Sequence, residues 1–191
     1  MSISTKVGDG GLTHLLGSRR VSKADQQIEV VGCLDELGAH LGFARSICGH
    51  EETGKYLKTI QQQLFAISEV AVSDCSDGAA SPRIDRAWIE DLTHEVNRIE
   101  QADGVLLDWA LTGEVSAAAA LDIARTVCRR TERATVRCVD AGTAIDRDII
   151  RYLNRLADLL WLLARVLERE AGADARLRGP DSAPVRWSRA W

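Results

Sequence analysis

Hydrophobic residues recur every three or four positions in five segments of the chain, and polar or glycine-rich stretches separate these segments. The segments lie at about residues 28–47, 56–73, 82–99, 116–140 and 146–170. This spacing is the period of an amphipathic helix, and no alternating strand pattern competes with it. The pattern therefore predicts an all-α fold, an antiparallel five-helix bundle of the ferritin-like, up-and-down type.

Local signals predict where several of these helices begin and end. Ser81 is expected to cap the third helix, with Pro82 in the first helical position, and Ser116 is expected to cap the fourth. Gly49 follows the first helix and Gly142 stops the fourth, because glycine tolerates the left-handed conformation common after a helix. The fifth helix is apolar on several sides, so we expect it to contact more than one neighbour.

The predicted bundle divides the chain into a glycine-rich N-terminal arm (1–27), a helical domain (28–172) and a C-terminal tail (173–191). The tail has no hydrophobic period, and Trp187 and Trp191 are expected to anchor it. With 191 residues, 46% of them hydrophobic, the chain is long enough for one domain with a substantial core.

Charge and cysteine content narrow the functional classes. A formal net charge of −4 argues against a general nucleic-acid binder, so any phosphate site must be local. The five cysteines are odd in number and form no CxxC pair, which indicates free thiols in a reducing compartment rather than a structural zinc site. No stretch reaches the length of a membrane span and no signal-like segment is present, so we expect a cytoplasmic protein.

The stretch "TKVGDGGLT" at residues 5–13 combines three glycines with a lysine. Glycines let the backbone turn its N–H groups toward an anion, and Lys6 adds a point charge, so a phosphate cradle is one interpretation. The spacing matches neither GxxxxGK[ST] nor GxGxxG, and a flexible arm is the alternative.

A second unusual stretch, "ARTVCRRTER", lies in the predicted fourth helix. Arg125, Arg129 and Arg133 are four residues apart, which places three guanidinium groups on one helix face. Like charges in a row repel one another, so either an acidic group faces them or the face is solvated, with Glu132 diluting the charge. Arginine forks and a glycine-rich loop are the two components that an oligophosphate site requires.

Two further helices carry polar residues beside apolar stripes. Asn154 and Asp158 lie one turn apart on the fifth helix, and Asn is a poor helix former that usually needs a reason to be there. Taken alone, a satisfied interhelical hydrogen bond is the favoured explanation. Asp35 flanks the apolar stripe of the first helix, either to meet an arginine or as an ordinary surface carboxylate.

Taken together, "TKVGDGGLT", "SRRVSK", "VVGCLDELGAHLG", "ARTVCRRTER" and "LNRLADLLWLLAR" resemble, in order and spacing, the PduO-type ATP:corrinoid adenosyltransferases. The resemblance covers residues 5–165. It implies a homotrimer with active sites between subunits, where the 5′-deoxyadenosyl group of ATP passes to the cobalt of reduced cobalamin. Triphosphate leaves and adenosylcobalamin forms. Mg²⁺ as a cofactor, an electron donor and a B12-dependent acceptor enzyme are also implied, with no metal ligand assigned among the protein side chains.

The resemblance also assigns residues to the site. Asp35, Arg129 and Arg133 are assigned to catalysis, with Asp35 pairing with Arg129 across the subunit interface. Asp108 and Trp109 are assigned to the corrinoid pocket, in the stretch "LLDWALTGEVS", where the family carries an aromatic residue and a PGG-like turn. The residues assigned to ATP are Thr5, Lys6, Val7, Gly8, Asp9, Thr13, His14, Lys23, Arg129, Arg130, Glu132, Arg133 and Asn154.

Two other classes of protein remain as alternatives. A ferritin-type metal protein needs Glu-x-x-His on two helices, and only the unmatched pair Asp91 and His94 comes near that pattern. A non-catalytic ATP- and corrinoid-binding chaperone or sensor retains the nucleotide motifs, and the altered "DWALTG" stretch is the feature that favours it.

Overall fold

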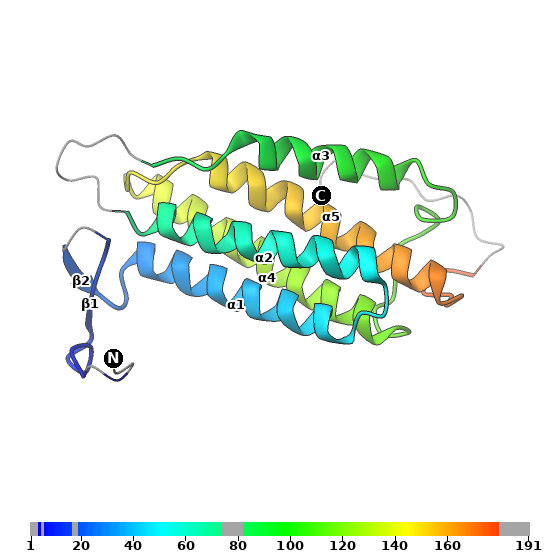
Figure 1. The fold of residues 1–191 in the computed structure, drawn as a ribbon, viewed down its shortest axis with the longest axis horizontal. Coiled ribbons are helices and arrows are strands. Elements are labelled where there is room, and N and C mark those ends of the chain that lie inside the picture. The colour runs from blue at the N-terminus through cyan, green and yellow to red at the C-terminus, as the bar shows by residue number, and fades with distance from the viewer. Residues whose placement is uncertain (1–3, 5, 17–18, 74–81, 180–191) are drawn as a thin grey trace.

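The computed structural model describes residues 4, 6–16, 19–73 and 82–179. Its five helices are α1 (Gln26–Ile47), α2 (Glu51–Ala71), α3 (Arg86–Glu100), α4 (Ser116–Asp140) and α5 (Asp148–Glu170). They lie lengthwise in an elongated bundle, and consecutive helices run in opposite directions (Figure 1). α1 packs on α2 and α4, and α5 packs on α3 and α4. The predicted antiparallel five-helix bundle is confirmed.

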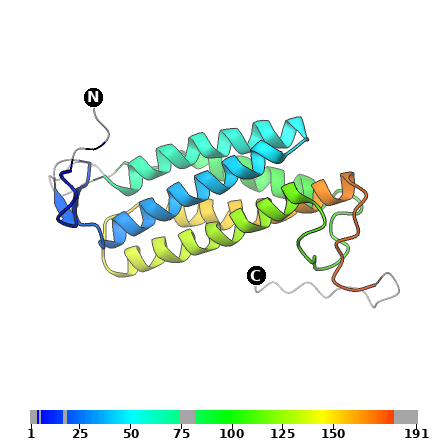
Figure 2. The same ribbon diagram turned by 90° about the horizontal axis from the view of Figure 1, so that it is seen from below.

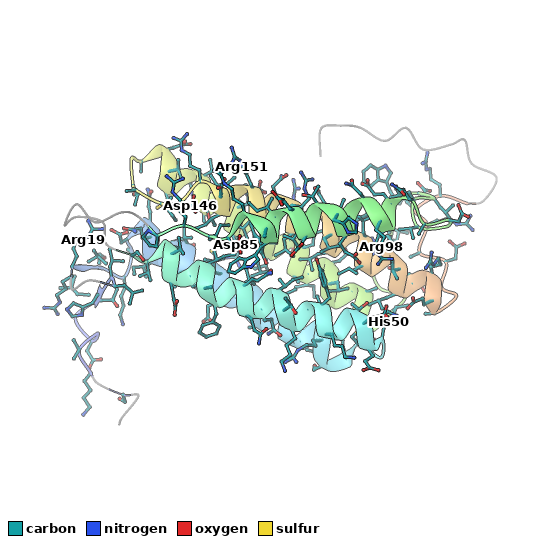
Figure 3. The ribbon with its side chains drawn as sticks, turned by 45° about the horizontal axis from the view of Figure 1, so that its top comes forward. Arg19, His50, Asp85, Arg98, Asp146 and Arg151 are labelled. Carbon is teal, nitrogen blue, oxygen red and sulfur yellow. The ribbon has the colours of Figure 1, made fainter. Side chains whose placement is uncertain are left out.

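The start of α3 differs from the prediction. The helix begins at Arg86, and Asp85 caps it by accepting a hydrogen bond from the backbone N–H of Ala87. Pro82 therefore precedes the helix instead of opening it, and Ser81 lies outside the described residues. The physical reason is a long-range contact: the Ile84 N–H donates to the Asp146 carboxylate at 2.9 Å. Figure 3 shows Asp85 and Asp146 at the same end of the bundle.

Two other helix starts also needed correction. α2 begins at Glu51, earlier than the predicted residue 56, because the ring of His50 caps it by accepting from the Thr53 N–H at 3.2 Å. Ser116 is the first residue of α4 rather than its cap, and Val115 occupies the capping position without a side-chain hydrogen bond. His50 is an uncommon capping residue, so the sequence carried no strong signal for it.

A short hairpin in the N-terminal arm was not predicted. β1 (Leu12–His14) pairs antiparallel with β2 (Arg20–Ser22), with Thr13 opposite Val21. The hairpin is tied to the bundle because the Leu16 N–H donates to the Val72 carbonyl at 3.1 Å. It lies at the end of the bundle where α1 begins, as two perpendicular views show (Figures 1 and 2). The arm is therefore anchored beyond one end of the bundle.

The core is built mainly from leucine, isoleucine, valine and alanine of all five helices. α5 contributes the largest share, which confirms the expectation that it contacts several neighbours. Tyr152 is fully buried on α5, and its hydroxyl donates to Gln63 of α2 at 2.7 Å. The cysteines in the described part of the chain, Cys33, Cys48, Cys128 and Cys138, are free thiols. None of the described helices combines the length and hydropathy needed to cross a membrane.

Candidate functional site

A cavity of about 570 Å³ lies between the end of α3, the α3–α4 loop, α4 and α5. Its apolar lining includes Trp109 from the loop and Trp161 and Leu162 from α5. Its charged lining includes Arg129 of α4 and Asp158 of α5. A cavity of this size, apolar with a few convergent polar groups, is typical of a small-molecule site.

Arg129 is half-buried in the lining of this cavity. Within the part of the chain that the structure describes, it makes no direct hydrogen bond or ion pair. Asp158 on the facing helix accepts a hydrogen bond from Arg155 at 3.1 Å. Burial raises the pKa of the Asp158 carboxyl, although the positive charges of Arg155 and Arg129 oppose that shift. The Arg129 guanidinium is thus positioned to accept an anionic ligand.

The three arginines predicted on one face of α4 have different surroundings. Arg125 pairs with Asp122, with Nε at 2.9 Å from Oδ1, so one acidic partner for the row lies on the same helix. Arg129 lines the cavity, and Arg133 is exposed one turn further along. Among the described residues, therefore, only the N-terminal arginine of the row forms an ion pair.

The adjacent arginine, Arg130, contacts a different helix. Its guanidinium donates to Glu36 of α1 and approaches Cys33 Sγ at 3.7 Å. Asp35 is exposed on α1 and forms no hydrogen bond or ion pair with the other described residues. A single chain therefore pairs Arg130 with Glu36, which the sequence had not identified. The predicted contact between Asp35 and Arg129 stays a prediction about the subunit interface.

Asn154 on α5 and Glu132 on α4 contact each other directly. The Asn154 amide donates to the Glu132 carboxylate, with Nδ2 at 3.2 Å from Oε1. This is the interhelical hydrogen bond that the sequence had allowed as an alternative role for Asn154. Asn154 itself is exposed, so the contact does not bury it.

The glycine-rich loop has a compact local structure. Lys6 adopts a φ of 58°, a left-handed conformation that is uncommon for a residue with a side chain. A Cβ atom placed on Gly8 would lie 2.8 Å from Lys23 Nζ, so the second predicted phosphate-binding lysine lies directly against this loop. The Lys23 N–H also donates to the Gly11 carbonyl at 2.9 Å. Lys23 and the loop therefore form one unit.

The other predicted ATP residues of the arm lie in or beside this unit. Val7 and Asp9 are exposed in the loop, and Thr13 and His14 belong to β1. Thr5 lies outside the described residues. The loop lies beyond one end of the bundle, whereas the α3–α4 loop lies at the other end (Figures 1 and 2). One chain therefore does not bring the glycine-rich loop to the cavity.

The two residues predicted for the corrinoid pocket lie in different environments. Trp109 lines the 570 Å³ cavity, and its ring meets Trp161 edge to face with a centroid distance of 6.4 Å. Asp108 is buried beside a smaller cavity of about 340 Å³, where its carboxylate pairs with Arg178. Trp161 was missed as a site residue; its only sequence signal is a large aromatic side chain within a run of leucines.

A buried ionic cluster contributes Arg165 and Asp122 to the lining of the cavity. Arg165 donates to Glu168 at 2.5 and 2.9 Å and to Asp122 at 2.8 Å. Its guanidinium also lies 5.2 Å from the centre of the Trp161 ring. Thr112 of the loop donates to the same Asp122 at 3.2 Å. The cluster therefore links α4, α5 and the α3–α4 loop.

The described residues contain no group of three or more histidines, cysteines and carboxylates arranged to hold a metal ion. A ferritin-type centre therefore has no ligand set in this part of the chain.

The sequence model of the cobalamin adenosyltransferase family matches residues 3–167 of the chain. The chain is 36% identical over 174 residues to the corrinoid adenosyltransferase PduO of Salmonella typhimurium, covering 90% of this chain and 51% of that protein. It thus spans about half the length of that relative. A corrinoid adenosyltransferase of Citrobacter freundii is 33% identical over 167 residues, covering 87% of this chain and 94% of that protein.

Solved structures are similar along nearly the whole chain. A variant PduO-type ATP:corrinoid adenosyltransferase from Lactobacillus reuteri, complexed with cobalamin and ATP, has a TM-score of 0.86 and 26% identity. The match covers 93% of this chain and 99% of that one. A second variant of the same enzyme, complexed with ATP, has a TM-score of 0.84 and 26% identity and covers 93% and 100% of the two chains.

Proposed function

This chain belongs to the cobalamin adenosyltransferase family, and we propose that it transfers the 5′-deoxyadenosyl group of ATP to the cobalt of a reduced corrinoid. In this reaction a cobalt–carbon bond forms at C5′, the C5′–oxygen bond breaks, and triphosphate leaves with the bonding electron pair. The observation that carries the proposal is a cavity lined by both Trp109 and Trp161 and by Arg129, in a chain of this family.

The apolar residues that line the cavity suit the corrinoid. Reduced cobalt is a strong nucleophile, so no side-chain general base is required, and the corrinoid itself carries the difficult step. The protein has to hold C5′ in line with the cobalt and exclude water. Trp109, Trp161 and Leu162 offer an apolar surface for that purpose.

The basic residues that we assign to the site suit the triphosphate. Negative charge grows on the leaving group as the C5′–oxygen bond breaks, and charged donors fixed in advance stabilise it. We assign this role to Arg129 and Arg133 of α4 and to Lys6 and Lys23 of the glycine-rich loop. Mg²⁺ usually binds through substrate phosphates and water, and we assign it no ligand among the protein side chains.

We further propose that each site is shared between two subunits of a homotrimer. α1 has 22 residues and is therefore about 33 Å long, and the glycine-rich loop precedes it whereas the α3–α4 loop lies at its far end. We therefore propose that a neighbouring chain brings its glycine-rich loop to this cavity. The exposed Asp35 and the 54% exposed Phe43, two turns apart on α1, support an interface on this helix, with Asp35 meeting Arg129 of the neighbour.

The corrinoid must be reduced before the reaction, so we propose that an electron donor acts with this protein. We also propose that a B12-dependent enzyme accepts the adenosylcobalamin product. The free thiols of the described cysteines are consistent with the reducing cytoplasm as the site of the reaction.

The direct test is to mix the protein with ATP, Mg²⁺ and chemically reduced cobalamin and to follow the decay of the cob(I)alamin absorbance. We expect ATP-dependent decay with formation of adenosylcobalamin and triphosphate. Binding of ATP and corrinoid by calorimetry without any decay would support the non-catalytic chaperone or sensor instead. Light scattering should report a trimer, and a fully active monomer would contradict the shared site.

A further inference from the structure

The α3–α4 loop that carries Trp109 is held by a segment near the C-terminus, residues 174–178, which we call the C-terminal strap. We infer that the strap positions Trp109 at the cavity and that Arg178 and Asp108 are positioning residues for the corrinoid substrate. The inference rests on the proposed function for the identity of that substrate. The contacts between strap and loop are properties of the fold alone.

Main-chain contacts join the strap to the loop at Trp109 and at the two residues that follow it. Ala110 and Arg176 form an antiparallel bridge. The Leu177 N–H donates to the Trp109 carbonyl at 2.7 Å, and the Leu111 N–H donates to the Ala175 carbonyl at 2.7 Å. These hydrogen bonds fix the backbone at Trp109 and two residues beyond it.

A side-chain pair closes the same junction. The Asp108 side chain is only 6% exposed, and the Arg178 guanidinium donates to Oδ1 through Nη2 at 2.7 Å and through Nε at 3.1 Å. Asp108 also accepts from the backbone N–H of Arg178 at 3.0 Å and of Trp109 at 2.7 Å. The Arg178 guanidinium holds the pKa of the Asp108 carboxyl below its usual value, so the pair stays ionised at neutral pH. Asp108 therefore joins the strap and the Trp109 backbone through one carboxylate.

The strap anchors a loop that has a glycine at each end. Gly104 and Gly113 flank it with φ values of 82° and 141°, in the region of backbone space that favours glycine and where the chain direction is easily changed. Trp109 lies midway between them, and its ring reaches Trp161 at the cavity. A shift of the loop about these glycines would move the indole that we assign to the corrinoid, without touching the phosphate side of the site.

That separation of the two substrates defines the test. Arg178→Gln removes the bidentate donor but leaves the main-chain bridge, and Asp108→Asn removes the charge but keeps a side-chain acceptor. Each variant should raise the KM for cob(I)alamin roughly tenfold, the loss expected from one charged hydrogen bond, and leave the KM for ATP and the melting temperature nearly unchanged. Arg178→Lys, which retains the charge but not the fork, should fall between wild type and Arg178→Gln.

The matched control is Arg176→Gln. It removes one positive charge from the same strap, but the Arg176 side chain pairs with Asp174 within the strap, at 2.7 Å, and makes no hydrogen bond to the α3–α4 loop. This variant should keep the wild-type KM for cob(I)alamin. An equal rise in the control would mean that net charge, and not the pair with Asp108, governs binding, and would overturn the inference.

Amide hydrogen exchange gives a readout that does not depend on activity. In Arg178→Gln we expect faster exchange at residues 105–113 and 174–178, with α3 unchanged. If the wild-type protein transfers no adenosyl group but this pattern appears, the proposed function fails and the strap contact stands. The positioning role is refuted if Arg178→Gln keeps both the wild-type exchange rates and the wild-type KM for cob(I)alamin. It is also refuted if kcat and stability fall while the ratio of the KM for cob(I)alamin to the KM for ATP stays constant.

Discussion

Replacing Arg165 with methionine should destabilise the bundle by about 3–5 kcal/mol, because it leaves a buried carboxylate without its cation. Arg165 is 6% exposed, and its guanidinium bonds both oxygens of Glu168 and one oxygen of Asp122. Methionine has a similar length and carries no charge. The substitution therefore removes the cation but leaves most of the packing volume filled.

The magnitude follows from the contacts that remain. Hydrogen bonds to charged groups contribute roughly 1.5–3 kcal/mol each, so three of them would suggest a larger loss. Asp122, however, keeps its contacts with Arg125 and Thr112. Glu168, which is 3% exposed, loses both of its hydrogen bonds from Arg165 and stays buried as a carboxylate. The cost therefore centres on Glu168, which places the total at about the 3–5 kcal/mol measured for breaking other buried pairs.

The assay is urea unfolding followed by far-ultraviolet circular dichroism, with all variants at one protein concentration because assembly contributes to apparent stability. For a chain of this size each kcal/mol should lower Tm by roughly 2–4 °C. The control is Arg98→Gln, which removes an exposed pair with Glu95 and should cost about 0–1 kcal/mol.

A double variant separates loss of the ionic contact from general damage. Arg165→Met combined with Glu168→Leu removes both charges, so it should be more stable than Arg165→Met alone by about 1–3 kcal/mol. The reasoning is refuted if Arg165→Met lies within about 1 kcal/mol of wild type, or if the double variant is the less stable of the two.

Three further predictions concern the site and the core. Lys6→Ala should raise the KM for ATP and leave the helical circular dichroism unchanged, since the loop lies outside the core; unaltered ATP binding by calorimetry would make the loop a simple arm. Alanine variants of Asp35 and Arg129 should each weaken the trimer and transfer, with a double-mutant coupling of about 1 kcal/mol or more, and strictly additive losses would remove the proposed pair. Cys128 is fully buried, and burial raises the pKa of its thiol well above 9.0, so it should resist alkylation at pH 8 until denaturant is added. The stabilisation from keeping this thiol neutral is complete below pH 9 and declines above it, and rapid labelling in the native protein would contradict its burial.

The five helices were predictable because their cause is local. Leu153, Leu156 and Leu160 are buried on α5 at the spacing that the sequence displays, and comparable stripes marked the other helices. The joint order of the motifs was equally informative, because five short segments at family spacing are far more specific together than any one alone. The family was therefore accessible from the sequence.

Helix starts and the hairpin were less accessible because distant residues determine them. α3 begins at Arg86 since Ile84 is held by Asp146, more than sixty residues away. The hairpin at Thr13 packs against the end of α2, and nothing within the arm itself signals that contact. A local pattern carries no information about a partner elsewhere in the chain.

The direction in which each polar side chain points was decided by tertiary packing alone. Arg129 and Arg130 are adjacent and chemically identical in the sequence, yet one lines the cavity and the other pairs with Glu36 of α1. Asp108 likewise contacts Arg178, seventy residues away. The sequence determined which groups are present and which helices carry them. Only the packing of α4 between α1 and α5 determined which of these groups face the cavity. Adjacent helical residues point about 100° apart, so each side chain contacts whichever helix packs on its side of α4.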